Sequence, residues 1–139
     1  PRPAGAPAPV VAAAVPASVA PDALRAIAGA TDYVVAMLYD EHYGGGEAGP
    51  VASAGWFDAA LARLTAVVPP GRLVAAIGAY GYDWNDADGR VRGDEMTFQD
   101  VARAARDHHA PVRFDATSRT PWLAWTDRDS TDHVVHYLD

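Results

Sequence analysis

Two short segments of the sequence combine carboxylates with aromatic side chains in a way that could orient a polar ligand. One is residues 39–42 (YDEH), and the other is residues 80–84 (YGYDW). A carboxylate beside a tyrosine can orient an amide or an acetal, and flat aromatic rings can cover the apolar face of a sugar ring. An equally good interpretation is that Tyr80 and Trp84 only cover the end of a sheet while Asp40 caps a loop.

The elements that would position these segments follow from the alternation of apolar and amphipathic runs. Residues 10–15, 32–39 and 73–80 are apolar, which predicts buried strands, and residues 21–30 and 54–68 have the spacing of helices. The order β-α-β-α-β is typical of a parallel sheet covered by helices. Function in such folds gathers at the carboxyl ends of the strands, where both polar segments lie.

The pattern changes after Trp84. Residues 86–96 are rich in turn-forming residues and predict a loop. Thr97 and Asp100 have the spacing of a capping box, which predicts a helix that ends near Asp107. Three short strands with turns between them are then expected, at residues 112–115, 121–127 and 133–139. This last part of the chain therefore reads as a small α+β unit.

Composition excludes several kinds of function. The 139 residues carry 11 basic and 18 acidic side chains, a net charge of −7, which argues against a nucleic-acid partner. The chain has no cysteine, which excludes disulfides, thiolate nucleophiles and cysteine-based zinc sites. Every basic residue is arginine and alanine is abundant, which favours a GC-rich bacterial origin.

Three segments together resemble glycoside hydrolase family 18, the chitinase-like enzymes. Residues 37–42 (MLYDEH) resemble the M-x-Y-D motif of barrel strand six, and residues 77–84 (IGAYGYDW) resemble the strand-seven motif. Residues 113–139 resemble the insertion between strands seven and eight of bacterial spore-cortex and LysM-linked members. The segment at residues 40–53, DEHYGGGEAGPVAS, is similar to the sequence found where such domains are fused to polysaccharide synthases or deacetylases.

The resemblance covers residues 10–139 and implies an α/β fold. It implies a partial (β/α)8 TIM barrel, about strands 5–7, at residues 10–84, with a small α+β insertion subdomain at residues 85–139. Residues 1–9 are expected to be a linker or frayed end, because prolines there remove backbone donors. Three parallel strands taken from a closed barrel would leave an exposed sheet edge, which predicts possible self-association.

The resemblance also implies a reaction and a set of residues. In the family, the N-acetyl oxygen of the sugar attacks its own anomeric carbon. By resemblance Tyr39 and Asp40 are the catalytic residues: Tyr39 would bond the N-acetyl group, and Asp40 would orient it and stabilise the cyclic cation. The other expected substrate-binding residues are Met37, which would pack beneath that site, and Glu41, Tyr80, Tyr82 and Trp84. No role can be assigned to Glu41 or to His42.

One departure from the family decides what this chain can do alone. The family's general acid ends a D-x-x-D-x-D-x-E motif on strand four, whereas residues 83–90 imitate that spacing but end in Arg90. We therefore expect a segment of a glycosidase acting on β-linked N-acetylhexosamine polymers, chitin-like or peptidoglycan-like, that is inactive in isolation. The alternative is a non-catalytic glycan-binding or scaffold segment of a multidomain envelope polysaccharide synthase or deacetylase.

No metal or cofactor is expected. A calcium loop at Asp86, Asp88, Gly89 and Glu95 would place Trp84 at its first ligand position, where an oxygen is needed. The expected partner is a polysaccharide or oligosaccharide of N-acetylhexosamines. The chain starts without Met and shows no signal peptide, which fits a processed product or an excised piece, so its location stays open. A longer bacterial protein of the cell envelope is the expected source.

Overall fold

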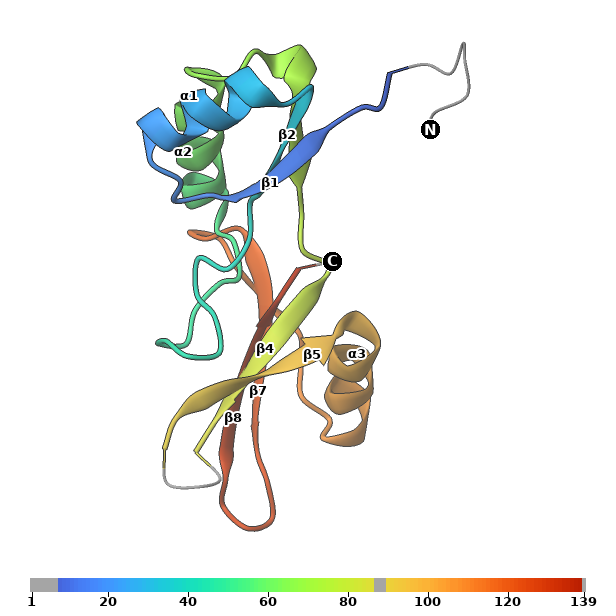
Figure 1. The fold of residues 1–139 in the computed structure, drawn as a ribbon. Coiled ribbons are helices and arrows are strands. Elements are labelled where there is room, and N and C mark those ends of the chain that lie inside the picture. Colours follow the sequence, from blue (N-terminus) through green and yellow to red (C-terminus); the bar gives the residue numbers. More distant parts are fainter. Residues whose placement is uncertain (1–7, 87–89, 139) are drawn as a thin grey trace.

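The computed structural model describes residues 8–86 and 90–138, which form two sheets joined through residues 77–79 (Figure 1). The first sheet has three parallel strands in the order β1-β2-β3. The second has five antiparallel strands in the order β5-β4-β8-β7-β6. Most of the linker predicted at residues 1–9 lies outside the described residues. Within the described ranges, every helix is too short or too polar to cross a lipid bilayer.

The first sheet has the order of elements that the sequence predicts. Its elements are β1 (Ala12–Pro16), α1 (Pro21–Ala30), β2 (Tyr33–Met37), α2 (Ala54–Thr65), the 3-10 helix η1 (Pro70–Arg72) and β3 (Leu73–Ala76). Helices α1 and α2 cover one face, where the core contains Leu24, Val34, Leu38 and Leu64. Helix α2 ends at Thr65 and not at residue 68. Val68 directly precedes Pro69, and a residue before proline avoids the helical region.

The opposite face of the first sheet is apolar and has no cover in the described part of the chain. Side chains alternate along a strand, so Val35 and its neighbours two residues away point away from the helices. Tyr33 is 41% exposed and Val74 is 46% exposed. Strands β1 and β3 are also open edges. Parallel sheets are normally covered on both faces, so apolar surface that such a sheet buries is in contact with water here.

The second sheet contains two strands that the sequence does not predict correctly. Its elements are β4 (Tyr80–Asn85), β5 (Arg92–Thr97), α3 (Phe98–Asp107), β6 (Arg113–Asp115), β7 (Thr120–Thr126) and β8 (Asp132–Tyr137). The strand predicted at residues 73–80 ends at Ala76, and β4 begins at Tyr80 in the other sheet. Residues 92–96 were predicted as loop, but β5 pairs along its whole length with β4, so backbone pairing overrides its polar composition.

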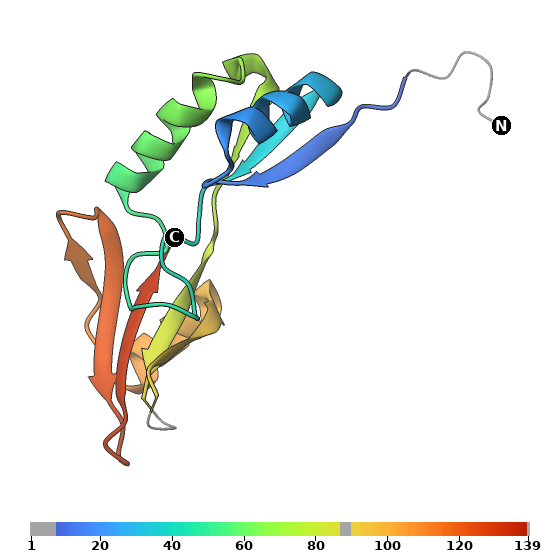
Figure 2. The same cartoon turned by 60° about the vertical axis from the view of Figure 1, so that its left-hand side comes forward.

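The two faces of the second sheet are covered by different parts of the chain. Helix α3 packs on one face, against Leu123, Val135 and Tyr137. It begins with the predicted capping box of Thr97 and Asp100, and the three strands predicted after it are present as β6, β7 and β8. The loop between β2 and α2, residues 38–53, lies against the other face (Figure 2). This loop carries the polar segment at residues 39–42.

Candidate functional site

The polar segment begins where β2 ends. Leu38 is still buried in the core, Tyr39 is half-buried, and Asp40 is exposed. Asp40 has a φ of 64°, in the left-handed region that costs most side chains energy but that Asp and Asn tolerate. This conformation turns the chain out of the strand and into the loop, and such strained positions gather at functional sites.

Two tyrosines from β4 hold the Asp40 carboxylate. The Tyr80 and Tyr82 hydroxyls both donate to Asp40 Oδ1, the latter over 3.1 Å. Burial, and then the hydrogen bond to Asp40, raises the pKa of both tyrosines, so both phenols stay protonated as donors. Because both bonds converge on Oδ1, the second carboxylate oxygen is the one that can accept a hydrogen bond from a ligand.

The aromatic rings around this carboxylate form a continuous row. The Tyr39 and Tyr80 ring centroids lie 5.9 Å apart at 81°, and those of Tyr80 and Tyr82 lie 5.6 Å apart at 85°. Edge-to-face contacts of this kind stabilise ring positions beyond simple burial. The structure thus brings Tyr39 and Asp40 together with Tyr80 and Tyr82, which lie 40 and 42 positions after Asp40 in the sequence.

A cavity of about 330 Å³ opens at the carboxyl ends of β1 and β2. This is near the lower end of the volumes of small-ligand sites. The cavity is lined by Pro16, Ala17, Ser18, Met37, Tyr39, Asp40, Glu41 and Trp56. Sequence reasoning missed Trp56, which it assigned only to the apolar stripe of a helix. Trp56 lies in the first turn of α2, and that turn lies near the carboxyl end of the strand before it, which is the signal that could have found it.

Two of the predicted ligand-binding residues have partners inside the protein. Glu41 accepts hydrogen bonds from the Ser53 amide at 2.6 Å and from its hydroxyl at 3.1 Å, while Ser53 caps α2 by accepting from the Trp56 amide. Trp84 is 2% exposed, and its indole N–H donates to the Gly46 carbonyl at 3.2 Å. Both residues therefore fix the loop, and their contact with a ligand stays a prediction.

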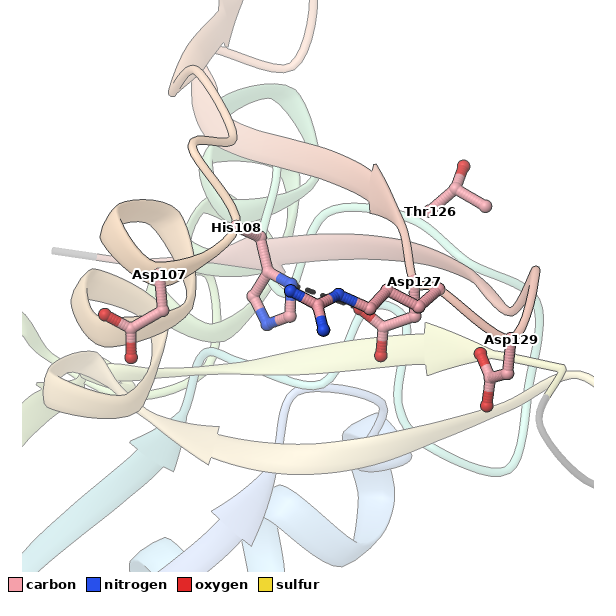
Figure 3. A pocket seen from close by; sticks show the side chains of 6 residues that line it. Asp107, His108, Thr126, Asp127 and Asp129 are labelled. Carbon is pink, nitrogen blue, oxygen red and sulfur yellow. Dashed lines mark ion pairs between the residues drawn. The ribbon is translucent and has the colours of Figure 1, made fainter.

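A second and larger cavity, of about 510 Å³, lies at the far end of the second sheet (Figure 3). It is lined by Asp107, His108, Thr126, Asp127, Arg128 and Asp129. His108 at the end of α3 faces Asp127 of the β7–β8 hairpin, with 3.1 Å between Nδ1 and Oδ1 (Figure 3). Among the described residues, no group of three His, Asp or Glu side chains is arranged to hold a metal ion.

The side chains behind this cavity serve packing. Trp125 is stacked between His108 and His133, with centroid distances of 4.8 and 4.5 Å, and its indole N–H donates to Asp127 at 2.9 Å. His133 Nδ1 lies 2.7 Å from the Asp83 carboxylate. Burial raises the pKa of Asp83, and the hydrogen bond and charge of His133 act in the opposite direction. Because these contacts join α3, β4, β7 and β8 to one another, we assign them to the stability of the second sheet, and the cavity beside Asp40 is the better candidate site.

Comparisons with known proteins relate the chain to glycosylases and chitinases. No protein-family model matches the chain. The chain is 30% identical over 106 residues to the uncharacterized glycosylase YvbX of Bacillus subtilis, a match that covers 76% of this chain and 30% of YvbX. A solved chitinase from Chromobacterium violaceum is 28% identical with a TM-score of 0.81, over 92% of this chain and 42% of the chitinase. The relatives of this chain are chitinase-like glycosylases.

Further relatives extend this picture. They include the cortical fragment-lytic enzyme of Bacillus subtilis, which is 26% identical over 110 residues. A class V chitinase from Nicotiana tobaccum, solved in complex with NAG4, shares the fold with a TM-score of 0.67 at 21% identity, over 94% of this chain and 44% of that one. The chain spans less than a third of the length of the curated relatives, 30% of YvbX and 26% of the cortical fragment-lytic enzyme. Its mixed α/β fold is thus similar to part of a chitinase-like glycosylase domain.

Proposed function

We propose that this chain is a segment of a family 18-like glycoside hydrolase that cuts β-linked N-acetylhexosamine polymers of the chitin or peptidoglycan kind. The observation that carries the proposal is the Asp40 carboxylate, held on one oxygen by Tyr80 and Tyr82 beside a cavity at the carboxyl end of β2. The likeness to glycosylases and chitinases supports it.

The proposed chemistry assigns one role to each side chain. The free oxygen of Asp40 accepts a hydrogen bond from the N–H of the acetamido group. This bond turns the carbonyl oxygen of the acetamido group toward the anomeric carbon. Tyr39 donates a hydrogen bond to the same group, and Met37 packs beneath it. An oriented nucleophile of this kind removes part of the entropic barrier to reaction. The protonated phenols keep the carboxylate in place throughout, because burial and Asp40 hold their pKa values above the ordinary range.

We propose that the first sheet is part of a (β/α)8 barrel. Its uncovered apolar face and its two open edges are what a barrel segment would present without its neighbouring strands. In this proposal the general acid is carried by a strand outside this chain, so the 139 residues alone bind but do not cut. Protonation of the leaving oxygen by a general acid contributes about 10²–10⁴-fold to the rate.

The second candidate function is a glycan-binding or scaffold segment without catalysis. The observation that favours it is that Glu41 is bonded to Ser53. Asp40 is then the one carboxylate of residues 39–42 that remains for a ligand, and a single carboxylate can bind a sugar without cutting it. The two functions differ in what precedes this chain. A D-x-x-D-x-D-x-E strand upstream favours the glycosidase, and a degenerate one favours the scaffold.

The test replaces Tyr39 with Phe in the longer protein and measures turnover of chitin oligomers and of peptidoglycan glycan strands. The matched control is Tyr33→Phe, an exposed tyrosine on β2, the strand that precedes Tyr39. We expect Tyr39→Phe to lower kcat/KM by about tenfold, the size of one lost hydrogen bond, and the control to be unchanged. Equal turnover in both variants would contradict the assignment of Tyr39, and no turnover of either polymer by the unaltered protein would favour the scaffold.

A further inference from the structure

The loop that carries Asp40 is held in place from the second sheet. Residues 38–53 contain no helix or strand, and three consecutive glycines lie within them, so such a loop should be free to move when nothing holds it. Gly93 of β5 donates its amide to the Gly44 carbonyl at 2.9 Å, and the Trp84 indole donates to the Gly46 carbonyl at 3.2 Å. We call these two contacts the glycine latch.

The latch has no room for side chains. A Cβ atom added at Gly44 would lie 2.2 Å from the Gly93 carbonyl oxygen, which is rigid backbone. A Cβ atom at Gly93 would lie 2.9 Å from the Gly44 Cα and 3.0 Å from the Trp84 ring. At Gly46 the nearest atom to an added Cβ is 3.6 Å away, which is an ordinary contact. The close approach of loop and sheet therefore depends on Gly44 and Gly93, and not on every glycine of the loop.

The latch also contacts the side chains that hold the candidate carboxylate. The Trp84 ring lies 5.5 Å from that of Tyr82, centroid to centroid, and Tyr82 donates to Asp40. Both Trp84 and Tyr82 belong to β4, whereas Asp40 belongs to the loop. The hydrogen bonds on Asp40 therefore span the gap between two separate parts of the fold. The latch is one of the contacts that hold these parts together, beside the bond from the Ala54 amide to the Ser118 carbonyl at 2.9 Å.

We propose that the glycine latch is a positioning device for the carbohydrate site: Gly44, Gly93 and Trp84 set the place of the Asp40 carboxylate against Tyr80 and Tyr82 without touching the sugar. That the ligand is a carbohydrate rests on the proposed function. The positioning of Asp40 by the latch can be tested without any sugar. In this arrangement the second sheet takes part in the reaction indirectly, because it determines where the loop of the first sheet lies.

The first test uses this chain with ¹³C-labelled tyrosine and follows the ionisation of Tyr80 and Tyr82 by NMR, with circular dichroism as a check of folding. The variant is Gly44→Ala, the matched control is Gly46→Ala, and Asp40→Asn shows the result of losing the carboxylate. We expect Gly44→Ala to lower the pKa of Tyr82 toward its ordinary value near 10, as Asp40→Asn does, and Gly46→Ala to leave it raised. Exchange of the Gly93 amide and of the Trp84 indole N–H should also become about fivefold faster or more in Gly44→Ala, the ratio that one lost hydrogen bond produces.

A folded Gly44→Ala variant with unchanged tyrosine ionisation and unchanged exchange would overturn the proposal. If that variant does not fold, Trp84→Phe replaces it. This change removes the indole donor together with part of a buried ring, so tyrosine ionisation and exchange of the Gly93 amide are the two measurements that apply. In the longer protein, Gly44→Ala should lower kcat more than it changes KM, whereas Gly46→Ala should change neither. Absence of glycan turnover in the unaltered protein would reject the proposed function. The tyrosine measurements would still show whether the latch positions Asp40.

Discussion

Replacement of Asp40 separates the backbone role of this residue from the role of its carboxylate. Asp40→Asn, Asp40→Gly and Asp40→Ala all remove the charge. Asn and Gly accept the left-handed conformation at φ 64°, whereas a left-handed alanine costs about 1–2 kcal/mol. Asp40 is exposed, so none of the three opens a cavity in the core.

The magnitudes follow from that comparison. A change of 1 kcal/mol shifts the melting temperature of a domain of 150–250 residues by about 2–4 °C. We therefore expect Asp40→Ala to melt about 2–8 °C lower, and Asp40→Asn and Asp40→Gly to melt within a few degrees of the unaltered protein. Turnover should fall about 10²-fold in all three, because the acetamido group is no longer oriented.

The assay is thermal unfolding together with steady-state turnover, both in the longer protein. Loss of activity that follows the loss of the carboxylate and not the loss of stability supports the assignment. If Asp40→Asn melts many degrees lower while the folded fraction turns over normally, Asp40 is a structural residue and the site has been placed wrongly.

Three further predictions concern the whole chain. The isolated 139 residues should not hydrolyse a chromogenic chitobioside, because they lack a general acid on a strand that precedes the site; turnover that a mutation within the chain abolishes would contradict this. The open edges at β1 and β3 should pair with another copy, so light scattering should report dimers or larger species, and a monomer at high concentration would argue against it. His136 lies between Trp84 and Trp122, and burial, then the charge of His42, lowers its pKa. The unfolded chain therefore binds more protons at His136 than the folded chain does, so stability should fall as the pH drops from about 6.5 toward the folded pKa. The melting temperature of His136→Phe should depend less on pH between pH 7 and 5 than that of the unaltered protein. Equal slopes of melting temperature against pH would disprove this.

The sequence predicts the first sheet well because its signals are local. Each strand there is a short apolar run, and Ser53 and the capping box at Thr97 mark the starts of α2 and α3 as expected. The same local rules fail at residues 77–96. The run LVAAIGAY is apolar throughout, so nothing in it indicates that the chain leaves one sheet at Ala76 and enters the other at Tyr80. Strand β5 is polar because it is an edge strand, and only pairing with β4 identifies it.

The candidate site was predictable in part for the same reason. Tyr39 and Asp40 are adjacent in sequence and follow a recognisable strand, so their position at a strand end could be expected. That Tyr80 and Tyr82 bond the same carboxylate oxygen depends on the docking of the loop against β4, which is a long-range contact. The pairing of Glu41 with Ser53 and the burial of Trp84 depend on the loop path as well, and no periodicity in the sequence encodes that path.

The second sheet begins and ends at one place. Strand β4 enters it and β8 leaves it, the two are antiparallel neighbours, and the Leu138 amide bonds the Tyr80 carbonyl across them. A module whose first and last residues are adjacent can be spliced into a connection of a host fold, or exchanged for another, without moving the host's own strands. Transplanting residues 80–138 into a related protein would therefore show whether this module is exchangeable, provided that the recipient loop keeps a glycine opposite Gly93.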